Sequence, residues 1–232
     1  MHLKDIFSAG TSKEKTSPEK PPLTDGYELE DGLKRYFTED QLDLLNNTHV
    51  FIAGCGGLGS NVAHMLVRSG FRKLTLLDFD VVDKSNLNRQ LFFPDQIGMT
   101  KTQALAQTLL RLEPDLVLEA ITGKIETPSD VATLTNDCDI IVEAFDTPEN
   151  KAVFVSGAVP TGKPVVSASG IAGYGHTDAI VVRHLSPTLY VVGDGESGID
   201  KAPPLSPRVT LAAAKEADIV LELALNNGKV EY

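Results

Sequence analysis

A glycine-rich segment at residues 54–59 places the strongest constraint on how this chain folds. It reads GCGGLG, so Gly54, Gly56 and Gly59 match the pattern G-x-G-x-x-G, and Gly57 is an additional glycine. The preceding run HVFIAG is typical of a strand, and the following run SNVAHMLVRSG has apolar residues at helical spacing. Glycines permit a tight turn and let backbone N–H groups approach a phosphate at the helix N-terminus. The segment therefore predicts a nucleotide-binding loop, with a purely structural glycine turn as the alternative.

Strand-like and helix-like segments alternate along most of the chain, which favours a parallel sheet with helices on both faces. We predict strands over residues 49–54, 73–80, 116–122, 137–145 and 164–169. We predict helices over residues 38–46, 60–69, 101–112 and 209–228. A further helix is expected to begin at residue 149 and to be broken by Gly157 and Pro160. Residues 176–185 and 188–194 resemble an antiparallel pair of strands. The expected fold is α/β and Rossmann-like, with an antiparallel extension near the C-terminus.

Length and composition fit one substantial domain, because 42% of the 232 residues are hydrophobic. We assign this domain to residues 31–232. Residues 1–30 are rich in lysine, proline, serine, threonine and acidic side chains, and such a composition cannot bury enough surface to offset the entropy of ordering. We therefore expect a flexible amino-terminal tail.

The charge balance disfavours whole classes of partner. The formal net charge is −11, whereas nucleic-acid and anionic-membrane surfaces need basic patches. The first residues lack the apolar run of a signal peptide, and no segment approaches the length of a membrane span. We expect a cytoplasmic protein with no nucleic-acid or membrane partner, although a local cluster of cations can still bind one nucleotide.

The cysteine and histidine spacings do not predict a metal site. The two cysteines, Cys55 and Cys138, form no CxxC pair, so zinc is not expected. Both fall in core or glycine-loop positions, which predicts buried thiols. The five histidines show no metal-ligand spacing, and His64 fits a structural role within a helix.

Acidic, amide and cationic side chains follow the second predicted strand. Asp78 and Asp80 lie at its end, where a carboxylate can accept hydrogen bonds from a ribose. The amides and cations further along are Asn86, Arg89, Gln90 and Lys101. Splitting ATP between its α- and β-phosphates needs such cations, because negative charge builds up on the bridging oxygen and the departing pyrophosphate. These residues therefore favour ATP over NAD, unless they lie on a solvated connection.

Asp146 directly follows the apolar run IIVEAF, at the expected carboxyl edge of the sheet. A carboxylate that faces a triphosphate is a natural Mg²⁺ ligand. The alternative is that Asp146 caps the next helix, with Pro148 in its first turn.

The segments GCGGLGS, LLDFDVVDKSNLNRQ, GMTK and EAFDTPENK together resemble the superfamily of ThiF, MoeB, HesA and the ubiquitin-activating enzymes. The resemblance spans residues 33–225. SASGIAGYGHTD, LYVVGDGES and PRVTLAAAKEADIVLELAL are most similar to short ThiF-type proteins, which adenylate the sulfur carrier protein ThiS in thiamine thiazole synthesis. This implies a homodimer that uses ATP to adenylate the C-terminal Gly-Gly of a ubiquitin-like carrier and releases pyrophosphate. A molybdopterin-synthase-type carrier and an NAD-dependent oxidoreductase remain alternatives.

The same resemblance implies a role for each candidate residue. Residues 54–59 line the phosphates, Asp78 holds the ribose and Asp146 binds Mg²⁺. The residues implied at the triphosphate are Asn86, Arg89 and Lys101, with Gln90 beside them. No protein nucleophile is needed for adenylation, so catalysis is expected to depend on positioning and on charge stabilisation by Arg89, Lys101 and Mg²⁺.

The chain departs from the family pattern at three points. It lacks the zinc-binding CxxC pairs of larger members, and no cysteine follows Cys138, so the reaction is expected to stop at the acyl-adenylate. Thr38 occupies the position where bacterial members often have an arginine that reaches the partner subunit's ATP, and Arg35 is the candidate substitute.

Residues 193–207 form a long predicted loop that either guides the carrier tail or is a surface excursion.

Overall fold

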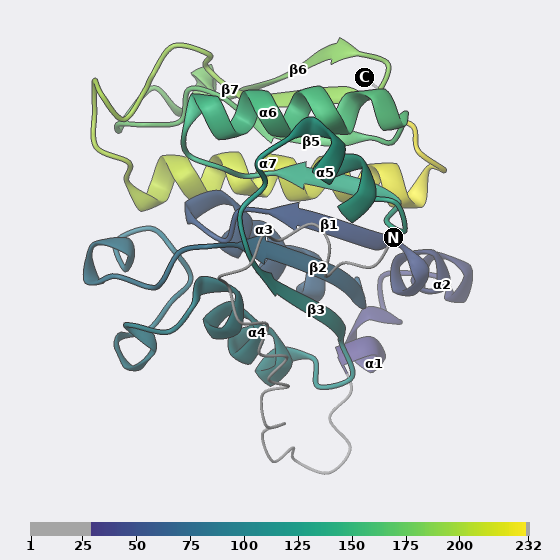
Figure 1. Ribbon diagram of the computed structural model, residues 1–232. Helices are drawn as coiled ribbons and strands as arrows, with labels where there is room; N and C mark the ends of the chain where they lie inside the picture. Colours follow the sequence, from purple (N-terminus) through teal and green to yellow (C-terminus); the bar gives the residue numbers. More distant parts are fainter. Residues whose placement is uncertain (1–28, 231–232) are drawn as a thin grey trace.

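The computed structural model describes residues 29–230, and its centre is one seven-stranded sheet with the strand order β3-β2-β1-β4-β5-β7-β6 (Figure 1). The strands are β1 (His49–Ala53), β2 (Lys73–Asp78), β3 (Val117–Thr122), β4 (Ile140–Glu143), β5 (Val165–Ala168), β6 (Val181–Ser186) and β7 (Leu189–Gly193). The predicted tail lies almost wholly outside the described residues.

Pairing in the sheet is parallel except at one edge. β1 pairs in parallel with β2 and β4, and parallel pairing continues to β3 on one side and to β5 and β7 on the other. Only β6 runs antiparallel, against β7. The expected Rossmann-like sheet with an antiparallel extension is therefore confirmed. The chain builds outward from β1 in one direction and then returns to its other side at β4, which creates a switch point of the kind where α/β proteins bind ligands.

Helices cover both faces of the sheet (Figure 1). They are α1 (Leu29–Leu33), α2 (Glu39–Asn47), α3 (Gly57–Arg68), α4 (Lys101–Leu112), α5 (Pro128–Leu134), α6 (Pro148–Ala158) and α7 (Ser206–Leu225). Side chains of β1 alternate between the faces: Ile52 joins the apolar cluster beneath α3, α4 and α7, and Phe51 joins the cluster beneath α5 and α6. Within the described residues, no helix is long and apolar enough to cross a membrane.

Local sequence signals set several of the helix ends. Thr38 is the N-cap of α2, where its hydroxyl accepts a hydrogen bond from the Gln41 backbone N–H. Gly70 follows α3 with φ of +105°, a conformation that favours glycine and ends the helix. The predicted bounds of α4 are those observed.

Other bounds differ from the prediction. α3 begins at Gly57, so the end of the glycine-rich segment is itself the first turn of the helix. The buried strand β4 is shorter than predicted, Ile140–Glu143. The short helices α1 and α5 were not predicted, because runs of five and seven residues carry too few turns for a clear 3.6-residue period.

Glu216 is an acid on the inner face of α7. It is fully buried, and neither of its carboxyl oxygens has a hydrogen-bond partner among the described residues. Burial raises the pKa of Glu216 to about 8; the positive charge of Lys151 opposes this shift, and the negative charge of Glu143 adds to it. The side chain is therefore mostly a neutral acid at pH 7.

Glu216→Gln is expected to increase the free energy of unfolding more at pH 8 than at pH 5, by an amount on the order of a few kcal/mol. The native state keeps the Glu216 proton up to about pH 8, whereas the unfolded chain loses it near pH ~4.3. The native state thus binds more protons between these values, so the wild type loses stability as the pH rises through this window, and glutamine does not.

Urea denaturation at the two pH values measures this difference. Asp218→Asn, at an exposed carboxylate of the same helix, is the matched control and should show no such gain. An equal pH-dependent gain in both variants would contradict a buried, neutral Glu216.

Candidate functional site

The candidate site lies where three neighbouring strands end at the carboxyl edge of the sheet. The Gly54 N–H donates to the Leu77 carbonyl at 2.7 Å, and the Ala144 N–H donates to the Ala53 carbonyl at 2.7 Å. These bonds continue the pairing of β2, β1 and β4 to the ends of the strands. They bring Asp78, the glycine loop (residues 54–59) and the segment that carries Asp146 to one place.

The glycine loop is a backbone surface that leads into α3. Gly54 has φ of +96°, and a Cβ there would lie 2.7 Å from the Ala144 carbonyl oxygen. Gly56 is the N-cap of α3 and provides no side-chain hydrogen bond to the helix. The first N–H groups of α3 therefore receive no cap from Gly56, and a helix N-terminus favours an anion such as phosphate. The loop thus fits a nucleotide phosphate.

Asp78 fixes the glycine loop from the end of β2. One carboxylate oxygen accepts from the Cys55 N–H at 2.6 Å, and the other accepts from the Asp80 N–H at 2.8 Å. Burial raises the pKa of Asp78, while these two hydrogen bonds favour its ionised form. The predicted ribose contact would use the lone pairs that remain on the same oxygens.

The structure brings Arg89 and Gln90 to the glycine loop. The Arg89 Cγ atom lies 3.5 Å from where a Cβ of Gly57 would be, and the Gln90 Nε2 atom lies 3.8 Å from a Cβ of Gly56. Gln90 is buried, and its Oε1 atom has no hydrogen-bond partner among the described residues. An orphaned acceptor beside an open backbone surface fits a site where a ligand or water supplies a donor.

Asn86 has a local role in the turn before Arg89. Its Oδ1 atom accepts from the Asp83 N–H at 2.9 Å, within a 3-10 turn capped by Asp83. Arg89 donates from Nη1 to the Ser85 carbonyl at 3.1 Å and to the Asn88 Oδ1 atom at 2.7 Å. Asn86 therefore shapes the segment that presents Arg89; its predicted contact with the triphosphate stays a prediction.

Lys101 lies at the start of α4 and forms an ion pair with Asp80. Its Nζ atom is 2.7 Å from the Asp80 carboxylate, and only 8% of its side chain is exposed. Asp80 thereby connects Lys101 to Asp78 through its own backbone N–H. A triphosphate would compete with Asp80 for this ammonium group. The predicted contact between Asp80 and the ribose stays a prediction.

Asp146 is exposed at the site edge and does not cap α6. Thr147 is the N-cap instead, with its hydroxyl accepting from the Asn150 N–H at 3.4 Å. The alternative prediction that Asp146 caps α6 is therefore wrong, and its carboxylate makes no capping bond to this helix. Among the described residues, no group of three or more His, Cys, Asp or Glu side chains could hold a metal ion. Mg²⁺ often binds through one carboxylate together with substrate phosphates and water, so Asp146 alone still fits it.

Glu143, which sequence patterns did not identify, anchors the segment that carries Asp146. It is fully buried and accepts from the Phe145 N–H at 2.8 Å, the Lys151 Nζ at 3.0 Å and the Ser167 Oγ at 2.5 Å. The sequence does contain one signal for Glu143: it is an ionisable residue at the end of an otherwise apolar strand. Its network joins β4, β5 and α6.

Ser60 and Asn61 are two further residues of the site that no sequence motif identifies. The Ser60 Oγ atom accepts from the Leu91 N–H at 3.0 Å, and the Asn61 Nδ2 atom donates to the Arg89 carbonyl at 3.1 Å. Both residues lie in the first turns of α3. They hold the Arg89 segment against the glycine loop.

Arg35 lies apart from the other candidates within one chain. It is exposed in the turn after α1, and the nearby Leu33 packs against Gly70, which follows the C-terminal end of α3. The glycine loop is at the other end of this 12-residue helix, a distance of about 18 Å. Contact with a partner subunit's nucleotide stays a prediction.

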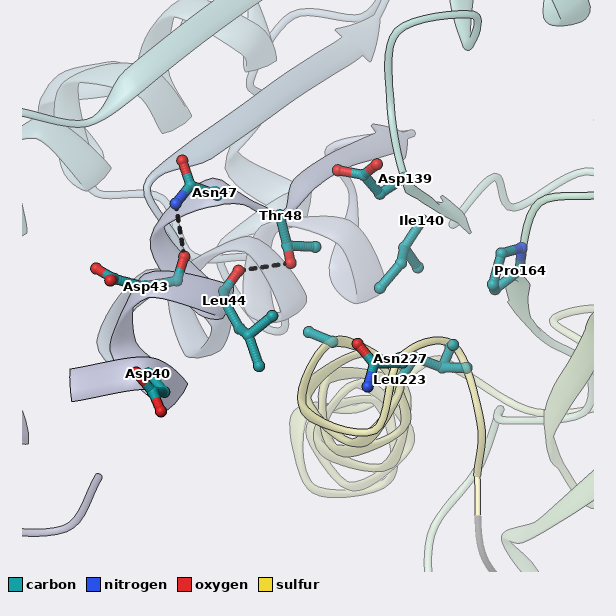
Figure 2. A pocket seen from close by; sticks show the side chains of 12 residues that line it. Asp40, Asp43, Leu44, Asn47, Thr48, Asp139, Ile140, Pro164, Leu223 and Asn227 are labelled. Atoms are coloured by element: carbon teal, nitrogen blue, oxygen red, sulfur yellow. Dashed lines mark hydrogen bonds between the residues drawn. The ribbon is translucent and has the colours of Figure 1, made fainter. Parts of the chain in front are cut away.

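A pocket of about 720 Å³ lies between α2 and the end of α7, away from these residues (Figure 2). Its lining includes Asp139 and Ile140 at the amino end of β4. Its lining residues include Asp40, Asp43 and Asp139 and no arginine or lysine, so their negative charge would repel a triphosphate. Its position and charge both disqualify it as the nucleotide site.

Comparisons with known proteins agree with this geometry. The family model described as "ThiF family" matches residues 31–214. "Ubiquitin-like modifier-activating enzyme 5" of Arabidopsis thaliana is 44% identical over 104 residues, which cover 45% of this chain and 24% of the plant protein. "Adenylyltransferase and sulfurtransferase MOCS3" of Xenopus laevis is 36% identical over 128 residues, which cover 55% of this chain and 28% of that protein. The chain thus spans less than a third of the length of these two relatives.

A solved structure shows the same fold. The Escherichia coli tRNA N6-threonylcarbamoyladenosine dehydratase in complex with ATP superimposes with a TM-score of 0.72 and 22% sequence identity. The match covers 85% of this chain and 96% of the dehydratase chain. At this level of identity, the likeness establishes the fold alone.

Gly59→Ala is expected to destabilise the protein by roughly 3 kcal/mol or more, because a methyl group would overlap the Gly54 carbonyl oxygen. Gly56→Ala is expected to cost less than about 1 kcal/mol, since only the Gln90 Nε2 atom lies within 4 Å of the added Cβ. Chemical denaturation of both variants measures the difference. Equal destabilisation would contradict the described packing of the loop.

Proposed function

The chain belongs to the ThiF family, and on this premise we propose that it is an ATP-dependent adenylyltransferase. Its proposed substrate is the C-terminal Gly-Gly carboxylate of a ubiquitin-like sulfur carrier protein, with a ThiS-type carrier of thiamine synthesis as the first to test. The observation that carries the proposal is the arrangement around the glycine loop. The Arg89 side chain lies beside Gly57, and Lys101 pairs with Asp80, whose backbone N–H donates to Asp78. Asp146 is exposed just after the adjacent strand β4.

The reaction joins the carrier to AMP. A carboxylate oxygen of the carrier attacks the α-phosphorus, a new O–P bond forms, and the bond between the α-phosphorus and the bridging oxygen breaks as pyrophosphate leaves. The backbone N–H groups at the start of α3 would hold the phosphates. Arg89 and Lys101 would stabilise the negative charge that develops on the bridging oxygen and the pyrophosphate.

Asp146 would hold Mg²⁺ against the phosphates, and the ion would supply further charge neutralisation there. Asp78 would orient the ribose while it fixes the glycine loop. All of these contributions are positioning and electrostatics, so no protein nucleophile is required.

The two cysteines support release of the adenylate to another protein. Cys55 and Cys138 are both buried. Burial raises the pKa of Cys55 well above its usual range and that of Cys138 to about 12. Neither thiol is poised to form a thiolate at neutral pH. We therefore propose that sulfur transfer takes place on another protein.

We also propose that the chain acts in the cytoplasm as a homodimer. In a dimer, the exposed Arg35 of one protomer could contact the nucleotide of its partner, which a single chain does not permit. Sedimentation of the protein with and without ATP tests the assembly, and the effect of Arg35→Ala on the KM for ATP tests the contact.

ATP–pyrophosphate exchange tests the activity. We expect exchange that depends on a purified carrier ending in Gly-Gly and stops when the terminal glycine is removed. Parallel reactions with ThiS-type and molybdopterin-synthase-type carriers identify the carrier class. No exchange with any carrier, together with binding of NAD or with ATP-dependent dehydration of modified tRNA, would overturn the proposal.

Asp146→Asn and Lys101→Met are each expected to lower the kcat of exchange by at least about 100-fold, because each removes charge stabilisation from the departing pyrophosphate. Glu149→Gln is the matched control for Asp146, because Glu149 is an exposed acid in the first turn of α6. Equal activity of Asp146→Asn and Glu149→Gln would show that Asp146 has no part in the reaction.

A further inference from the structure

Arg208, the third residue of α7, connects two loops beside the candidate site. Its side chain is almost completely buried. The Nη2 atom donates to the Asp194 carboxylate at 2.7 Å and to the Ser197 Oγ at 3.3 Å, and the Nη1 atom donates to the Gly175 carbonyl at 2.8 Å. One guanidinium group thereby holds loop 169–180, which follows β5, and loop 194–205, which follows β7.

The two loops also bind each other through their backbones. The Gly173 N–H donates to the Pro203 carbonyl at 2.9 Å, and the Asp194 N–H donates to the Gly170 carbonyl at 3.0 Å. Gly170 has φ of +77°, and a Cβ at this position would collide with the Asp194 carboxylate. This close packing fixes the position of each loop relative to the other.

The Arg208–Asp194 pair stays charged across the physiological range of pH. Burial alone would raise the pKa of Asp194, but hydrogen bonds from Ser197, Glu196 and Arg208 outweigh it and lower the pKa to about 2. The arginine is always protonated. A charge-assisted hydrogen bond at 2.7 Å in a largely buried setting is a strong constraint on both loops.

The joined loops border the nucleotide-binding residues. The Asn88 Nδ2 atom donates to the Pro204 carbonyl at 3.1 Å, directly beside Arg89 in the sequence. Val209, next to Arg208, has its Cγ1 atom 2.8 Å from where a Cβ of Gly57 would be. Loop 194–205 is therefore in contact with the Arg89 segment, and α7, which carries Arg208, lies against the glycine loop.

The loops follow strands that lie across the central strand from the candidate ribose ligand. Asp78, the candidate ribose ligand, is on β2, to one side of the central strand β1, whereas β5 and β7 lie on the other side. Each loop presents one apolar side chain to solvent: Tyr174 is 79% exposed and Ile199 is 62% exposed. Aromatic side chains are enriched at protein–protein interfaces, where a few anchors carry most of the binding energy.

We propose that Arg208 is a positioning residue for recognition of the carrier protein: it holds loops 169–180 and 194–205 so that Tyr174 and Ile199 form the docking surface for the carrier. This inference rests on the adenylyltransferase function proposed above. Arg208 itself does not touch the reacting atoms, so its loss should affect carrier binding far more than nucleotide binding.

The test compares the KM values for carrier and for ATP in the pyrophosphate exchange assay, with a purified ThiS-type carrier as the probe. In Arg208→Lys, the guanidinium group that donates to both loops is replaced by a single ammonium group. Asp194→Asn removes the negative charge of the Asp194 side chain but keeps its size and shape. Both are expected to raise the carrier KM at least about tenfold, with the KM for ATP changed by less than about twofold. Lys201→Gln, an exposed cation of loop 194–205 outside the Arg208 contacts, is the matched control and should behave like the wild type.

Tyr174→Ala and Ile199→Ser test the docking surface independently of folding, because both side chains are exposed. They are expected to raise the carrier KM without changing the melting temperature or the KM for ATP. An active wild type whose carrier KM is unchanged in Tyr174→Ala and Ile199→Ser overturns this inference alone, even if the Arg208 variant fails to fold. A wild type without exchange overturns the proposed function, and this inference with it.

Discussion

Asp78 joins the parts of the candidate site that lie on one side of the central strand. Its carboxylate accepts a hydrogen bond from the glycine loop at Cys55 and another from Asp80, whose own carboxylate holds Lys101. One buried acid thus sets the position of the backbone that would hold phosphate and, through Asp80, of a cation that would neutralise it. The energetic cost of burying Asp78 is offset by these two charge-assisted bonds, so the loop and the acid depend on each other.

Glu143 has the corresponding role on the other side of the central strand. It is also a buried acid at the end of a strand, and its bonds to Phe145, Lys151 and Ser167 fix the segment that ends in Asp146. The two acids hold opposite sides of the site in a fixed relation while Asp146 and part of Asp80 stay accessible. Buried acids thus position the site, whereas Arg89, Lys101 and the backbone N–H groups at the start of α3 would supply the attraction for a polyphosphate in a chain with a net charge of −11.

Features set by neighbouring residues could be predicted from the sequence. The glycine loop, the cap at Thr38, the end of α3 at Gly70 and the alternation of strands and helices all follow from local spacing. The contacts that assemble the site could not be predicted in this way, because they join distant positions: Asn61 and Arg89 are 28 positions apart, and Arg208 and Gly175 are 33 apart. The sequence leaves open whether Asp146 caps α6 or binds a metal ion, and the structure gives the cap to the neighbouring Thr147.

The carboxyl ends of β2, β1 and β4 are the proposed nucleotide site. A crystal structure with a non-hydrolysable ATP analogue and Mg²⁺ tests it most directly. We expect phosphates against the backbone at the start of α3 and the ribose at Asp78, with Arg89, Lys101 and Asp146 facing the triphosphate. A nucleotide bound in the pocket between α2 and α7, or with its phosphates directed away from the glycine loop, would contradict it.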